Sequence, residues 1–207
     1  MSEFDLSDGL GVSRETFDRL KLYEGLVRKW NPAINLVARS TLDHIWQRHF
    51  VDSAQLYAAS GARTGRWVDL GSGGGFPGLV VAALAGGEGR ELKITLVESD
   101  QRKAAFLRTA AREMGLAGVE ILTARIEDLP PLKADILSAR ALAPLDGLLG
   151  FCALHMKEDG IGLFPKGQNY RTEIDQALEN WRFSYEALPS AAADDAVVLT
   201  VRNIERA

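Results

Sequence analysis

Cysteine and histidine are scarce in this 207-residue sequence, which contains one cysteine and three histidines. The single cysteine, Cys152, excludes an internal disulfide bond, and the spacing of His44, His49 and His155 matches no familiar zinc-binding pattern. We therefore expect no metal site. The shares of hydrophobic residues (46%) and charged residues (25%) are those of an ordinary globular chain. A chain of this length buries enough apolar surface to fold without such crosslinks.

Long apolar runs and a positively charged leader are also missing. The longest unbroken apolar run covers residues 79–85, or seven residues, whereas a helix that spans a bilayer needs about 20. The N-terminal segment carries Glu3, Asp5 and Asp8 where a secretory signal needs positive charge. We therefore expect a cytoplasmic protein with no membrane partner.

The balance of charge argues against one class of nucleic-acid protein. The net charge of −4 disfavours a protein that coats nucleic acid indiscriminately by releasing counterions. A local basic surface is still possible, because residues 21–48 hold five bases and two acids. That excess alone is also typical of a solvated helical face.

The first 64 residues have a helical pattern. Ser13 can cap a helix in which apolar residues recur at spacings of three and four from Phe17 to Trp30, and the Asn31-Pro32 pair is expected to end it. Two further short helices are expected over residues 41–48 and 52–60. We interpret residues 1–64 as an N-terminal helical cap.

After residue 64 short apolar strands alternate with helices. Strands are predicted at 67–70, 92–98, 119–124, 135–140 and 161–166, and helices from the glycine loop to 85 and over 100–114, 144–157 and 170–181. This alternation predicts an α/β fold with a mostly parallel sheet and helices on both faces. Residues 183–188 and 196–204 have no helix between them and are expected to form a C-terminal antiparallel hairpin. Residues 65–207 are thus predicted to be one compact Rossmann-like core.

A glycine-rich loop, DLGSGGGFPG at residues 69–78, lies between the first predicted strand and a helix. It satisfies the dinucleotide pattern G-x-G-x-x-G from Gly73 to Gly78. It also fits D-x-G-x-G-x-G from Asp69, which resembles motif I of Rossmann-like S-adenosylmethionine methyltransferases. A carboxylate at the strand end would repel a pyrophosphate but can attract the ammonium group of a methionine moiety. The second interpretation is therefore favoured, with S-adenosylmethionine as the cofactor.

Two later segments fit the same cofactor. Glu98 ends the next strand, where a carboxylate can accept hydrogen bonds from both ribose hydroxyls. Residues 124–128, ARIED, follow the third strand, where methyltransferases of this class place a residue that contacts the adenine edge. A glycine-rich turn flanked by solvated acids is the alternative interpretation.

Missing motifs narrow the methyl acceptor. Methylation at C5 of a pyrimidine needs a cysteine nucleophile, but Cys152 lies in an apolar helical pattern. The Asn/Asp-Pro-Pro-aromatic motif of enzymes that methylate exocyclic amines is replaced by residues 138–142, SARAL. A nucleophile with a free lone pair, such as guanine N7, needs placement but no general base. We assign no catalytic acid or base.

Five segments together resemble the bacterial glucose-inhibited division protein B family, RsmG: DLGSGGGFPG, ARIED, SARAL, FPKG at residues 164–167 and RHFVDS at 48–53. The resemblance runs from about Asn31 to the end of the chain. It implies S-adenosylmethionine-dependent methylation of guanine N7 in 16S rRNA, in a loop near the decoding site. The implied partner is 16S rRNA or the 30S subunit, and we expect a monomer.

The resemblance also implies site residues. Those expected at the cofactor are Gly71, Phe76, Ile126, Glu127 and Arg140 from the family, and Asp69, Gly73 and Glu98 from the general motif. His49, Arg125 and Lys166 are expected at the substrate or RNA from their own placement: residues 48–53 can bring His49 to the mouth of the site, and Lys166 ends the fifth strand on the ligand side. A helix-capping network around Asp52 and Ser53 is the alternative for the first segment, and a plain exposed basic side chain is the alternative for Lys166 and Arg125. Phe76 departs from the small aliphatic residue of some relatives. Arg140 can bind either the methionine carboxylate or a substrate phosphate, and a surface ion pair is the third possibility.

Two other functions are compatible with the residues. One is a methyltransferase that acts on a small molecule or a protein, because residues 1–64 hold equal numbers of bases and acids. The other is a module that binds S-adenosylmethionine without catalysis.

Overall fold

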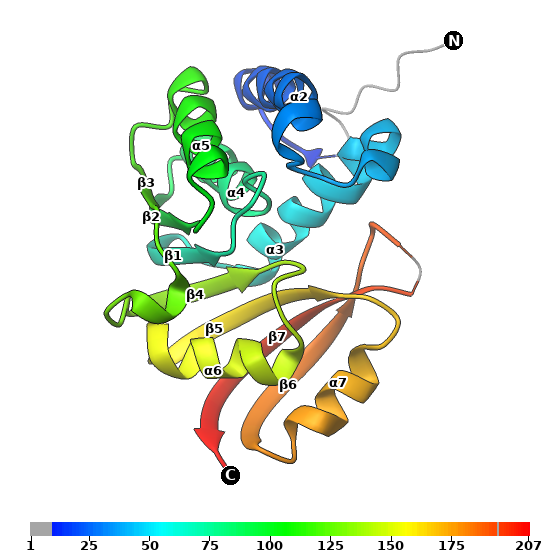
Figure 1. Ribbon diagram of the computed structural model, residues 1–207, viewed down its shortest axis with the longest axis vertical. Helices are drawn as coiled ribbons and strands as arrows, with labels where there is room; N and C mark the ends of the chain where they lie inside the picture. The colour runs from blue at the N-terminus through cyan, green and yellow to red at the C-terminus, as the bar shows by residue number, and fades with distance from the viewer. Residues whose placement is uncertain (1–9, 194) are drawn as a thin grey trace.

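One seven-stranded sheet forms the centre of the computed structural model, which describes residues 10–193 and 195–207 (Figure 1). The strand order is β3-β2-β1-β4-β5-β7-β6. Neighbouring strands are parallel from β3 to β5, whereas β7 is antiparallel to both β5 and β6. The mostly parallel Rossmann-like sheet with a C-terminal hairpin is therefore confirmed. The strands are β1 (Thr64–Leu70), β2 (Glu91–Val97), β3 (Val119–Leu122), β4 (Ala134–Ala139), β5 (Met156–Lys166), β6 (Trp181–Pro189) and β7 (Val197–Arg206).

Helices cover both faces of the sheet because successive strand residues point to opposite faces. In β1, Trp67 belongs to one apolar cluster with α2, α3, α4 and α5, and Val68 to a second cluster with α6 and α7. Figure 1 shows these two groups of helices on opposite sides of the sheet. The bounds are α2 (Arg14–Ile34), α3 (Asp52–Ser60), α4 (Gly78–Gly87), α5 (Gln101–Glu113), α6 (Leu145–His155) and α7 (Tyr170–Ala177).

The first helix begins where the sequence predicts but ends later. The Ser13 hydroxyl accepts a hydrogen bond from the Thr16 amide, as expected of an N-cap. The predicted stop at Asn31-Pro32 is wrong, because α2 continues to Ile34 with Pro32 inside it. The Asn31 side chain accepts a hydrogen bond of 2.8 Å from the Val37 amide, and its carbonyl accepts one from the amide of Asn35. These bonds stabilise the end of the helix, although Pro32 has no N–H to donate a helical hydrogen bond.

Two other helix predictions need correction. The α-helix expected over 41–48 is a 3₁₀ segment, η1 (Arg39–His44), followed by a π-helical segment, η2 (Trp46–Val51), that leads directly into α3. Wide π-helical turns re-aim side chains and are frequent at functional sites. The helix predicted to reach Trp181 ends at Ala177, because Trp181 already pairs with Arg206 as the first residue of β6.

The acidic residues of the N-terminal segment, Glu3, Asp5 and Asp8, lie outside the described residues. Over the part of the chain that the structure describes, the helices are too short or too polar to cross a bilayer. Across residues 10–193 and 195–207, no three His, Cys, Asp or Glu side chains gather as a metal site would require. Cys152 lies on the buried face of α6, in the second apolar cluster, as its apolar neighbours predict.

Candidate functional site

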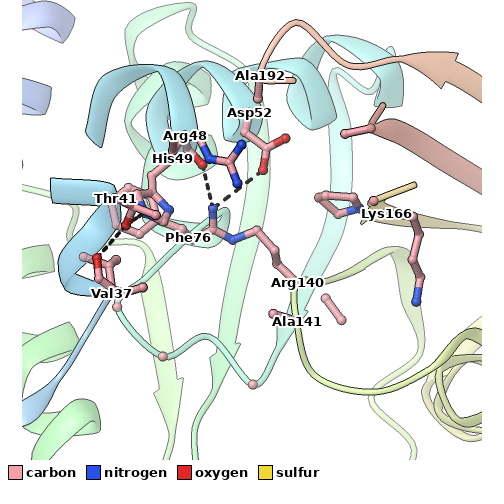
Figure 2. A pocket seen from close by; sticks show the side chains of 18 of the residues that line it. Val37, Thr41, Arg48, His49, Asp52, Phe76, Arg140, Ala141, Lys166 and Ala192 are labelled. Carbon is pink, nitrogen blue, oxygen red and sulfur yellow. Dashed lines mark hydrogen bonds and ion pairs between the residues drawn. The ribbon is translucent and has the colours of Figure 1, made fainter. Parts of the chain in front are cut away.

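A cavity of about 920 Å³ opens at the carboxyl ends of β1, β4 and β5. The order of the strands reverses at this point: from β1 the chain continues to β2 and β3 on one side of the sheet, and then crosses to β4 and β5 on the other side of β1. Open α/β sheets bind their ligands at such a switch point. The walls come from residues 71–76, the segment from Leu36 to Asp52, residues 139–143, and the loop that joins β6 to β7 (Figure 2).

The glycine loop presents backbone to the cavity. Gly71, Gly73 and Gly75 have φ angles of 62°, 54° and 91°, a region that disfavours side chains. A Cβ at Gly71 would lie 2.7 Å from Cδ1 of Leu142, so the loop and the segment after β4 touch there. A Cβ at Gly73 would meet only the Gly71 carbonyl oxygen, at 3.8 Å. Gly73 therefore leaves open the space that a ligand would enter.

Asp69 and Glu98 lie behind this loop and do not line the cavity. Asp69 is fully buried, and its carboxylate accepts hydrogen bonds from the Ser138 hydroxyl (2.7 Å) and the Gly78 amide (3.3 Å). Burial raises the pKa of Asp69 to about 6, although the hydrogen bond from Ser138 acts to lower it. Glu98 accepts bonds of 2.8 Å from the amides of Gly73 and Asp100. Both carboxylates thus fix the shape of the loop.

Arg140 extends from the end of β4 into the cavity and is held there by several contacts. Its Nη1 lies 3.6 Å from Oδ2 of Asp52 and donates to the Arg48 carbonyl at 3.2 Å. Its guanidinium also lies over the Phe76 ring, 5.3 Å from the centroid. The side chains of Arg140 and Asp52 are only 19% and 10% exposed. Burial lowers the pKa of Arg140 and raises that of Asp52, and their mutual attraction opposes both shifts.

His49 lines the same wall as a neutral imidazole. Its Nε2 lies 2.8 Å from the Thr41 hydroxyl oxygen, and its ring centroid lies 5.0 Å from that of Phe76. Burial lowers the pKa of His49 to about 3, and the positive charges of Arg140 and Arg48 act in the same direction. Its Nδ1 is buried with no hydrogen-bond partner among the described residues. The imidazole is therefore available for packing or hydrogen bonding, but is not a cation at neutral pH.

The other predicted residues are placed differently. Lys166 lines the cavity, but it is buried, and its ammonium binds Glu173 at 2.6 Å and the Ala143 carbonyl at 3.3 Å. In Figure 2 its side chain points away from Arg140. Arg125, Ile126 and Glu127 are not among the lining residues: Arg125 and Glu127 are exposed, and Ile126 is buried as the first residue of η3 (Ile126–Asp128).

The cavity therefore brings together six of the predicted residues: Gly71, Gly73, Phe76, Arg140, His49 and Lys166.

Sequence reasoning missed several lining residues. Lys103 reaches the cavity from the first turn of α5, and Arg48 and Asp52 reach it from η2 and α3. The position of Lys103 three residues after the helix cap Asp100 is a signal that sequence reasoning could have used. The β6–β7 loop has no such signal. Residues 192–193 and 195–196 of this loop line the cavity, and the Gln47 side chain donates a hydrogen bond to the neighbouring Ala191 carbonyl.

Comparison with known proteins identifies close relatives. A family model described as GidB, rRNA small subunit methyltransferase G, matches residues 16–196. The ribosomal RNA small subunit methyltransferase G of Ruegeria pomeroyi is 52% identical over 197 residues, which cover 95% of this chain and 96% of that protein. The protein of the same name from Cereibacter sphaeroides is 52% identical over 193 residues, covering 93% of each chain.

Solved structures with low sequence identity share the fold. A putative S-adenosylmethionine-dependent methyltransferase from Methanococcus maripaludis has a TM-score of 0.60 at 10% identity, over 100% of this chain and 99% of that one. A TehB-like S-adenosylmethionine-dependent methyltransferase from Corynebacterium glutamicum has a TM-score of 0.57 at 13% identity, over 88% of this chain and 98% of that one. These likenesses support the methyltransferase fold.

Proposed function

The chain belongs to the rRNA small subunit methyltransferase G family, and from this premise we propose how its cavity works. We propose that the protein transfers the methyl group of S-adenosylmethionine to N7 of a guanine in 16S rRNA, near the decoding site of the small subunit. The observation that carries the proposal is the cavity itself, where the open glycine backbone is followed in the same loop by Phe76, whose ring lies against His49 and Arg140.

The residues around the glycine loop fit S-adenosylmethionine. Gly73 leaves space that a Cβ would fill, so a ligand can contact the backbone there. Glu98 uses its carboxylate oxygens to accept from two amides, and a carboxylate with about four lone-pair sites can accept further bonds from ribose hydroxyls. When bound, the cofactor supplies a methyl group on a positively charged sulfur. Ile126 and Glu127 remain candidates for the adenine end, outside the cavity wall.

The cluster of His49, Phe76 and Arg140 fits an anion and a flat base. Arg48 and Arg140 both exert their charge on the single carboxylate of Asp52, so the cluster keeps one net positive charge. A guanidinium fork suits either the methionine carboxylate or an RNA phosphate. Phe76 and the neutral His49 can pack against a nucleobase that is turned into the cavity. We assign Lys166 and the exposed Arg125 to RNA phosphates or to placement of the substrate.

Guanine N7 suits these residues because the reaction requires no proton to be removed before methyl transfer. The lone pair on N7 could accept the methyl group directly, so no side chain of the protein would have to accept a proton. The chain's part is then to position the base, exclude water and place charge. The Asp52 carboxylate is held by Arg140, and the His49 Nε2 is occupied by Thr41. Neither group needs to act as a base in this proposal.

We also propose that residues 1–64 act as a helical cap on a core formed by residues 65–207. The two parts share one apolar cluster, in which Leu20 and Tyr23 of α2 join Leu79 of α4 and Phe106 of α5. The cap is therefore continuous with the core beneath it.

Methyl transfer to isolated fractions tests the proposal. Purified protein and tritiated S-adenosylmethionine are incubated with undermethylated 30S subunits, naked 16S rRNA, total protein or a small-molecule extract, followed by nucleoside analysis. We expect labelled 7-methylguanosine from subunits or rRNA. Label in protein or small molecules would overturn the assigned acceptor, and cofactor binding without label in any fraction would favour a non-catalytic binding module. Arg140→Ala should lose labelling, whereas Arg112→Ala, an exposed arginine of α5, should keep it.

A further inference from the structure

The N-terminal helix contacts the glycine loop through one buried tyrosine. The hydroxyl of Tyr23, on α2, donates a hydrogen bond to the carbonyl of Gly74. Tyr23 is fully buried, and its ring packs against Phe76, Phe50 and Phe106 at centroid distances of 5.0, 5.5 and 6.4 Å. The aromatic contacts fix the ring, and the ring in turn fixes where its hydroxyl can reach.

Two other bonds of the loop come from the core of the protein. The amide of Ser72 donates to the Val97 carbonyl at the end of β2, and the amide of Gly73 donates to Glu98. Gly74 is the next residue of the loop, and its carbonyl accepts the hydrogen bond from Tyr23 of α2. The loop is thus held on one side by the core and on the other by the N-terminal helix.

Close contacts at the same point show how little room the loop has. A Cβ at Gly74 would lie 3.0 Å from the Leu36 carbonyl oxygen, just after α2, and a Cβ at Gly75 would lie 2.6 Å from the Tyr23 hydroxyl. Two consecutive glycines therefore touch the N-terminal segment. Burial raises the pKa of Tyr23 well above its ordinary value, so its hydroxyl remains a donor at any working pH.

We infer that Tyr23 is a positioning residue for the cofactor site, and that the N-terminal helix acts through it to hold the glycine loop ready for the ligand. The inference rests on the proposed function, since it assigns the loop to S-adenosylmethionine. Without the hydroxyl, the Gly74 peptide can rotate and the loop occupies its binding conformation for less of the time. The apparent Kd equals the intrinsic Kd divided by the fraction of molecules in the binding conformation, so a smaller fraction gives weaker binding.

Tyr23→Phe tests this role because it removes the hydroxyl and keeps the ring. Tyr57→Phe is the matched control, since Tyr57 is also buried and its hydroxyl donates to Glu88 at 3.0 Å, away from the loop. Calorimetry with S-adenosylmethionine and S-adenosylhomocysteine gives the Kd of each protein, and thermal melting gives its stability. We expect Tyr23→Phe to raise Kd roughly 3- to 10-fold, the loss of one hydrogen bond, and Tyr57→Phe to leave Kd unchanged.

Hydrogen exchange in the ligand-free protein is the second measurement, and it does not depend on the cofactor. The amide of Gly75, which donates to the Ser72 carbonyl at 2.7 Å within the loop, should exchange faster in Tyr23→Phe than in Tyr57→Phe. A Kd within twofold of wild type for Tyr23→Phe would overturn the inference, even if its melting temperature fell. An equal loss of affinity in both variants would do the same.

The failure of the proposed function gives a different result. If the unmodified protein binds neither S-adenosylmethionine nor S-adenosylhomocysteine, the assignment of the loop is wrong, whatever the variants do. Unchanged exchange at Gly75 in Tyr23→Phe would instead show that Tyr23 does not position the loop.

Discussion

Gly78→Ala should destabilise the protein, because Gly78 is the point where α4 packs directly on the sheet. A Cβ added there would lie 2.1 Å from Cδ2 of Leu96 and 3.0 Å from Oδ2 of Asp69. Carbon atoms in contact normally lie about 3.5–4.0 Å apart. Leu96 is fully buried in β2, so it has no free space into which to move. Overpacking of this kind costs about 1–3 kcal/mol.

Thermal melting measures this cost. For a chain of this size each kcal/mol corresponds to about 2–4 °C in Tm, so a loss near the middle of the range lowers Tm by about 4–8 °C. Cofactor affinity should fall as well, because the Gly78 amide donates to the carboxylate that braces the loop. Gly25→Ala is the control: Gly25 lies inside α2 with no atom within 4 Å of an added Cβ. That change should stabilise the protein by about 0.5–1 kcal/mol. If Gly78→Ala melts at or above the wild-type temperature, the close helix–strand contact has been misjudged.

Three further outcomes follow from the site and the core. Arg140→Lys keeps the charge but loses the guanidinium fork, so kcat/KM for methyl transfer should fall roughly 10- to 100-fold; a value within twofold of wild type would show that the fork is not used. Nuclear magnetic resonance titration should give His49 a pKa near 3, well below the ordinary value for histidine. Because the folded pKa of His49 lies below the unfolded value of about 6.5, its contribution to stability is present above that pH and is lost as pH falls toward 3. A midpoint above 6 would contradict its burial. Cys152 should resist alkylation in the native state at neutral pH, since burial raises the pKa of its thiol, and rapid modification without unfolding would be the opposite result.

The order of strands and helices after residue 64 could be predicted because it depends on local patterns. Each central strand is a short apolar run, α5 has a stripe of apolar residues, and α4 begins with an unbroken buried run over residues 78–85. The end of α2 could not be predicted, because Asn31 forms a side-chain bond to Val37 that offsets a residue which usually ends helices. The 3₁₀ and π turns of residues 39–51 were missed for a similar reason. Their geometry depends on packing such as the stacking of Trp46 on Phe50, whose ring centroids are 4.3 Å apart.

The residue types of the site could be predicted better than its contacts. The glycine pattern identified the loop, and the segments at 48–53 and 138–142 supplied His49 and Arg140, which the fold brings to one cavity. The partners of the site residues depend on the tertiary fold. Asp52, far from Arg140 in the sequence, meets it only in the folded chain, and Lys166 meets Glu173 only through the turn between β5 and α7. No periodicity or spacing in the sequence predicts these ion pairs.

The two acids of the glycine motif show why a motif does not by itself fix a residue's role. The sequence suggests that Asp69 and Glu98 contact the ligand, because a carboxylate at a strand end suits an ammonium group or a ribose. In the structure both carboxylates also accept bonds from the backbone of the loop or of the helix after it, at Gly78 for Asp69 and at Gly73 for Glu98. A loop of glycines with positive φ has few side chains of its own to stabilise it, so acceptors behind it must hold its amides. The same acids therefore satisfy a structural need that exists before any ligand binds, and contact with the cofactor is an additional role that Glu98 has the lone pairs to perform.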